Sequence, residues 1–122
     1  MQDLYGEREQ LFDQLMQELE ALRRTGQQYA ENEAEYRKAL RIAILEERSK
    51  GTPVTVISDL CRGRPDIAEK KQLRDCAEAL YKASSEAIMA IKLRIKTVDA
   101  DIQRTWTSGG TGEGSFLWAS TE

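Results

Sequence analysis

No proline interrupts residues 3–50, a stretch that consists mostly of Gln, Glu, Leu, Ala and Arg, all strong helix formers. Apolar residues recur at alternating steps of three and four, most densely at 11–22 and 36–45. The pattern predicts one long helix over 3–50. Its weak zone is 23–35, because Gly26 costs about 1 kcal/mol relative to Ala inside a helix and favours a kink or break.

A second long helix is predicted over residues 65–106. Pro65 suits the first helical position, and Asp66 and Glu69 are placed at the positive end of the helix dipole. An apolar seam follows from Leu73 to the end of this stretch. Alanines are frequent in its middle, so a partner helix can approach closely there.

The segment 51–64 between the two helices is predicted to form a short helical cap at a turn. Gly51 suits the position after a helix end, Thr52 an N-cap and Pro53 the first residue of a new helix. Gly63 would end this helix. The β-branched residues between them also suit a strand, but a lone short strand would have no partner.

The expected fold is therefore all-α, a long antiparallel, coiled-coil-like hairpin over residues 1–106. Counting back from the turn places residue 47 near 68 and residue 15 near 100. A hairpin buries one stripe per helix and leaves second apolar faces exposed, so we expect assembly into a four-helix bundle as a dimer or larger homo-oligomer. These second faces comprise Phe12, Met16 and Ile44 on the first helix and Ile88, Met89 and Leu93 on the second.

Residues 107–122 change character to Gly, Ser and Thr, followed by the apolar triplet Phe116, Leu117 and Trp118. This segment is either a flexible tail or a linker that carries the triplet as a docking motif. The glycines of 109–114 have no strand before them and no Gly-Lys-Ser/Thr, so they are read as linker and not as a phosphate loop.

The absence of histidine removes Ser-His-Asp and Cys-His nucleophile systems and His-based metal sites. Cys61 and Cys76 lie 15 residues apart and are expected to be reduced thiols. Acidic residues alternate along the helices and so do not pair for metal binding. We expect no enzyme, no catalytic residue, no metal and no cofactor.

The net charge of −3 hides an uneven distribution, because residues 48–74 carry seven basic and three acidic side chains. Tyr36 and Tyr81 are expected to lie roughly opposite each other in the hairpin. A basic, partly aromatic surface suits a phosphate-bearing ligand or a single strand, whereas an ordinary solvated helix face is the alternative. The candidate binding residues are Tyr36, Arg37, Arg41, Arg48, Arg62, Arg64, Lys70, Lys71, Arg74 and Tyr81.

The runs 35–40, 51–63 and 74–81 resemble those of small helical proteins encoded by phages and prophages of Gram-positive bacteria, usually left as hypothetical proteins. The similarity spans about residues 29–106, and Pro-Val-Thr…Asp-Leu-x-Arg-Gly within 53–63 is its most specific part. It implies a phage accessory protein encoded near recombination or early functions, located in the cytoplasm of the infected or lysogenic bacterium. It supplies no catalytic residues.

We therefore expect a non-enzymatic accessory protein that self-associates and binds a host or phage protein or a phosphate-rich ligand. One alternative is a nucleic-acid-binding factor in phage recombination. Another is a counter-defence protein that sequesters a nucleotide signal or inhibits a host nuclease. The most apolar stretch, residues 87–91, is far shorter than the roughly 20 residues of a membrane span, so no membrane association is expected.

Overall fold

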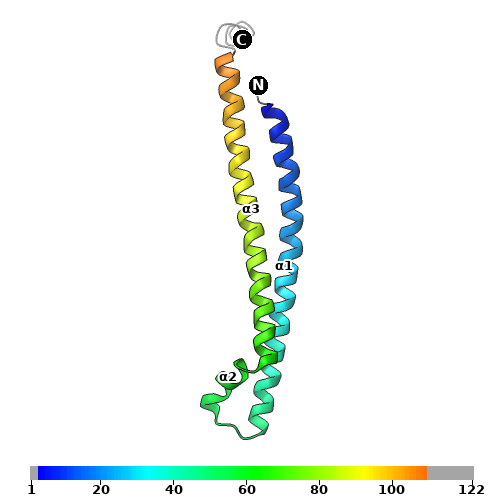
Figure 1. Ribbon diagram of the computed structural model, residues 1–122, viewed down its shortest axis with the longest axis vertical. Coiled ribbons are helices and arrows are strands. Elements are labelled where there is room, and N and C mark those ends of the chain that lie inside the picture. The colour runs from blue at the N-terminus through cyan, green and yellow to red at the C-terminus, as the bar shows by residue number, and fades with distance from the viewer. Residues whose placement is uncertain (1–2, 110–122) are drawn as a thin grey trace, which may run out of the picture. The chain divides into compact units, whose positions relative to one another are not determined.

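A computed structural model describes residues 3–109 of the chain. It contains α1 (Leu4–Ser49), α2 (Val54–Arg62) and α3 (Pro65–Gly109), and the described part has no strand. The long helices α1 and α3 pack against each other as a hairpin, with α2 at the turn (Figure 1). The predicted all-α hairpin is confirmed, and α3 continues three residues beyond its predicted end.

The helix α1 is continuous through Gly26, so the break considered at that residue does not occur. A Cβ atom at this position would lie 3.1 Å from Cε1 of Tyr81. Glycine therefore lets the tyrosine ring of α3 lie directly against the backbone of α1. The residue that weakens the helix locally is used for close packing between the helices.

The turn begins at Gly51, whose φ of +79° is the left-handed conformation expected of a glycine after a helix end. The prediction for the next two residues was wrong by one position. Pro53 is the N-cap of α2, and Thr52, in the turn after α1, forms hydrogen bonds back to the last turns of α1. The Thr52 hydroxyl donates to Glu47 Oε2 over 2.8 Å, and its backbone N–H donates to the Glu47 carbonyl over 3.2 Å.

Contacts within the chain divide it into two units. We call Glu20–Ser85 the turn unit. The other, the terminal unit, is described over residues 3–19 and 86–109. Each unit contains a segment of α1 packed against a segment of α3.

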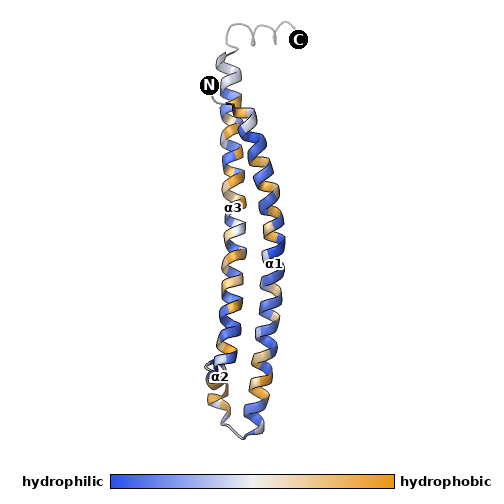
Figure 2. Ribbon diagram, turned by 45° about the vertical axis from the view of Figure 1, so that its right-hand side comes forward, coloured by the Kyte–Doolittle hydropathy of each residue, from blue (hydrophilic) through white to orange (hydrophobic). Residues whose placement is uncertain are grey.

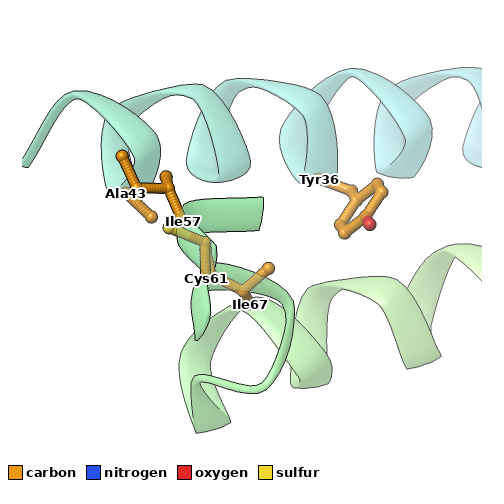
Figure 3. Packing of buried hydrophobic residues seen from close by; sticks show 5 residues of the cluster. All are labelled: Tyr36, Ala43, Ile57, Cys61 and Ile67. Carbon is orange, nitrogen blue, oxygen red and sulfur yellow. The ribbon is translucent and has the colours of Figure 1, made fainter. Parts of the chain in front are cut away.

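The core of the turn unit takes side chains from all three helices. Ile57 and Cys61 of α2 lie between Ala43 of α1 and Ile67 of α3, as Figure 3 shows. Tyr36 joins the same cluster further along α1, and all five side chains are at most 7% exposed. The helix α2 thus packs as a third helix and does more than cap the hairpin end.

The predicted pairing register needs correction. The prediction places residue 69 opposite residue 46, but Arg64 Nη1 lies 3.0 Å from Glu46 Oε2. The difference follows from the packing of α2 against the last turns of α1, since α3 then begins alongside those turns. In consequence Tyr36 faces Arg74, and Tyr81 lies beside Tyr29.

The terminal unit has its own apolar seam. Leu11 of α1 packs against Ile95, Val98 and Ile102 of α3, and all four are buried. Arg8 Nη1 contacts Asp99 Oδ1 over 3.2 Å, so the register is displaced from the predicted one here too. Residue 15 therefore lies nearer to residue 92 than to 100.

The expected second apolar faces are exposed at four of their six positions. Phe12, Met16, Met89 and Leu93 are between 47% and 66% exposed. Ile88 is buried and Ile44 packs against the core of the turn unit, so these two were assigned wrongly. Both lie one position from a predicted seam residue, where helical spacing alone separates the faces poorly.

Several predictions concern residues at the ends or single side chains. Phe116, Leu117 and Trp118 lie outside the described residues. Cys61 is buried, Cys76 is exposed, and neither forms a disulfide. Across residues 3–109, every helix is too short in apolar sequence or too rich in charge to cross a membrane.

The core of the turn unit predicts that two apolar residues of α3 differ in how much stability is lost when each is replaced by alanine. Ile67→Ala removes a side chain that is 2% exposed and should lower the free energy of unfolding by about 2–4 kcal/mol. Leu73→Ala, at a position that is 54% exposed, should cost less than about 1 kcal/mol. Urea titrations followed by circular dichroism measure both, and equal losses would contradict the described core.

Candidate functional site

The basic residues chosen from the sequence do not form one cluster. Arg37, Arg41 and Arg48 are exposed and share one face of α1, because they are spaced by four and seven. Arg37 Nε is held 2.6 Å from Glu33 Oε1. Arg41 and Arg48 have no ion pair within the described residues.

At the turn, Arg64 is engaged within the protein. Its guanidinium lies 3.0 Å from Glu46 and 3.2 Å from Asp66, linking the end of α1 to the start of α3. The hydrogen bond to Glu46, followed by that to Asp66, raises the pKa of Arg64. This arginine links the two helices, and its charge is balanced by two carboxylates of the protein itself.

Arg74 is largely enclosed, with a side chain only 20% exposed. Its Cζ atom lies 4.7 Å from the centroid of the buried Tyr36 ring. Nη1 is 3.3 Å from Glu33 Oε2, and Nη2 is 2.8 Å from Asp75 Oδ1. The hydrogen bond to Asp75 is the main reason that the pKa of Arg74 is raised. Arg74 and Tyr36 thus act as packing partners.

A polar layer continues from Arg74 through the middle of the turn unit. Tyr29 Oη donates to Glu78 Oε2 over 2.6 Å, and Lys82 Nζ lies 3.2 Å from Glu78 Oε1. These bonds, the tyrosine bond above all, lower the pKa of Glu78, and the carboxylate raises the pKa of Tyr29. The Tyr29 and Tyr81 ring centroids are 6.1 Å apart.

Sequence reasoning missed Tyr29, Glu33 and Glu78 as partners in this layer. A signal was present, because Tyr29 and Glu33 occupy seam positions of α1 where apolar residues are expected. Polar residues at seam positions indicate that the facing helix supplies complementary groups. The facing residues could not be identified from the sequence, because the predicted register was displaced by several residues from the one in the structure.

An open depression lies between the end of α2 and the exposed side of α3. Arg62 and Lys71 line it together with Gln72, Asp75 and the free thiol of Cys76. Lys71 Nζ is 4.0 Å from Asp75 Oδ2, whereas Arg62 has no ion pair among the described residues. The neighbouring Lys70 is partly buried and also has none there.

The candidate residues therefore separate into two groups. The first makes intramolecular contacts and comprises Tyr36, Arg37, Arg64, Lys71, Arg74 and Tyr81. The second comprises Arg41, Arg48, Arg62 and Lys70, whose charges are unpaired within residues 3–109. No three His, Cys, Asp or Glu side chains of that range gather into a metal-binding group.

Comparisons with known proteins returned no match to a family model, a curated protein or a solved structure. The resemblance to phage-encoded proteins in residues 29–106 thus stays a prediction. The functional argument rests on the described residues themselves.

The polar layer predicts a stability that declines in acid. Because the pKa of Glu78 in the folded protein lies below its ordinary 4.5, its contribution is complete above that pH and is lost as the pH falls through the lower value. Glu78→Gln should therefore unfold more easily than the native chain at neutral pH. The difference should shrink in acid. Denaturant titrations across this pH range test it, and a pH-independent difference would contradict the assignment.

Proposed function

We propose that this chain is a non-enzymatic protein that works by binding: it self-associates and engages a partner protein or an anionic ligand. The proposal is supported by what the helix pair leaves uncovered. Two packed helices bury one stripe each, and large apolar side chains outside those stripes stay in water. Figure 2 shows hydrophobic and hydrophilic residues alternating along both α1 and α3.

The observation that carries the proposal is the extent of the exposed apolar surface. Within residues 3–109, fifteen large apolar side chains are at least 36% exposed, more than the eleven apolar residues that are buried. Isolated exposed apolar residues are normal, but such a proportion is typical of chains that bury more surface by association. Met16, Met89 and Leu93 are each more than 60% exposed.

Self-association is tested by size-exclusion chromatography with light scattering, with absorbance read at 260 and 280 nm on the same peak. We expect a mass of at least twice the 13.9 kDa of the chain, because burial of these exposed apolar faces would be the main source of the free energy of association. A folded monomer at all concentrations would overturn self-association. A raised 260 nm signal would show that nucleic acid or nucleotide is retained.

The unpaired arginines of α1 favour a second candidate function, the binding of single-stranded nucleic acid. Arg41 and Arg48 lie on one exposed face, and neither is neutralised within the described residues. Such cations bind phosphates without sequence preference and release counterions in doing so. The two functions are compatible, because self-association would multiply the number of such faces.

This candidate predicts a steep dependence on salt. Replacing Arg41 and Arg48 by Ala should reduce the slope of log K against log salt concentration by about 1.4, at about 0.7 for each phosphate contact. Fluorescence anisotropy with a labelled oligothymidylate measures the slope. Arg23→Ala with Arg24→Ala removes the same charge from another part of α1 and serves as the control. Binding that does not change with salt would exclude this function.

A further inference from the structure

In the terminal unit, α1 carries an exposed apolar strip beside its buried seam. The strip consists of Phe12, Met16 and Leu19, which are 47%, 66% and 40% exposed. Their spacing of four and three places them on one face of the helix. Phe12 and Met16 each follow a seam residue, Leu11 and Leu15, by one position.

Acidic side chains accompany this strip. Glu9 and Asp13 are exposed, and each lies three positions before a residue of the strip, Glu9 before Phe12 and Asp13 before Met16, which places it beside that residue on the surface of α1. Neither has an ion pair within residues 3–109. The strip is thus an apolar ridge flanked by unneutralised negative charge, and we call it the acidic strip.

The facing helix carries a strip of opposite charge. Met89 and Leu93 of α3 are 62% and 65% exposed. Lys92 and Lys96 lie between and beyond them, are exposed and form no ion pair in the described part of the chain. We call these four residues the basic strip.

Both strips emerge on the same side of the helix pair. Most residues of each strip follow the buried seam by one position, as Phe12 follows Leu11 on α1 and Lys92 follows Ile91 on α3, whereas Asp13 and Leu93 follow it by two and lie further round their helices. One residue is a rotation of about 100° in a right-handed helix. Because the two helices run antiparallel, equal rotations seen along each chain bring both strips to one common surface.

The strips also lie at the same level. Arg8 contacts Asp99 across the pair, so each step forward on α1 corresponds to one step back on α3. Glu9 is therefore level with residue 98 and Asp13 with residue 94. Lys96 thus lies between the levels of the two carboxylates, and Lys92 lies two residues beyond the level of Asp13.

We propose that this surface binds a second copy of the chain, related by a two-fold axis parallel to the helices of the terminal unit. A half-turn about that axis lays each acidic strip on the basic strip of the partner and preserves their common level. Both contacts form at once, which closes the assembly as four antiparallel helices. The inference rests on the self-association in the proposed function and identifies its interface.

Charge decides between this arrangement and its simplest competitor. An axis across the helices would place α1 on the partner's α1 and α3 on the partner's α3. Acidic strip would then meet acidic strip, and lysines would meet lysines, which disfavours association. Only the parallel axis pairs the apolar ridges and also neutralises Glu9, Asp13, Lys92 and Lys96.

Charge reversal tests the interface with the full chain in sedimentation equilibrium. Glu9→Lys with Asp13→Lys should raise the dimer dissociation constant by about tenfold or more, and Lys92→Glu with Lys96→Glu should do the same, since each makes both contacts repulsive. The chain that carries all four changes should regain affinity close to the native value. An equimolar mixture of the two double variants should form heterodimers.

A matched control separates the effect of a change in net charge from the effect of a change at the proposed interface. Glu35→Lys with Glu69→Lys makes the same change in net charge at exposed positions of the turn unit, and should leave the dissociation constant within about twofold. Circular dichroism on every variant confirms that the helices persist. A native dimer that is insensitive to both double reversals would overturn this interface while leaving self-association intact. A native chain that stays monomeric would overturn both.

Discussion

The turn unit depends on the packing of α2 against the end of α1. Ile57 and Cys61 fill the space between Ala43 and Ile67, and their burial decides where α3 begins. The helix α2 is amphipathic, and burial of the two side chains on its apolar face, Ile57 and Cys61, is the kind of interaction that drives folding. Once α2 is seated alongside α1, Arg64 meets Glu46, and the pairing of every later residue of this unit follows.

That register brings together polar and charged side chains whose partial burial would cost free energy if they lacked partners. The middle of the turn unit lacks a continuous apolar seam, and a layer of Tyr29, Glu33, Arg74 and Glu78 takes its place. Each charge in this layer has a partner, so partial burial carries no unsatisfied group. Arg74 was a candidate for phosphate binding, but its neighbours engage it as a structural residue. The unpaired cations Arg41, Arg48 and Arg62 are better suited to a ligand.

Two packed helices can bury only one stripe of side chains each, and this limit is the reason that self-association is central to the proposed function. A helix pair has one shared seam, and the terminal unit has a narrow one formed around Leu11, Ile95 and Val98. Apolar surface that remains exposed contributes to stability only if another surface covers it. In the proposed dimer, the opposite charges beside the exposed ridges of α1 and α3 would favour one orientation of the second copy. The exposed apolar residues of α1 and α3 would then contribute both to association and to the stability of the folded helices.

The sequence alone determined the helices, because proline-free runs, helical spacing, Pro65 and the left-handed Gly51 act within a few residues. It also indicated most of the exposed second faces and the basic candidates. Tertiary structure decided the register, the burial of Ile88, the contact of Gly26 with Tyr81 and the division of the cations into paired and unpaired groups. In the turn unit, the register depends on where α2 packs along α1. That position is set by the fit of side chains distant in sequence, which no local pattern encodes.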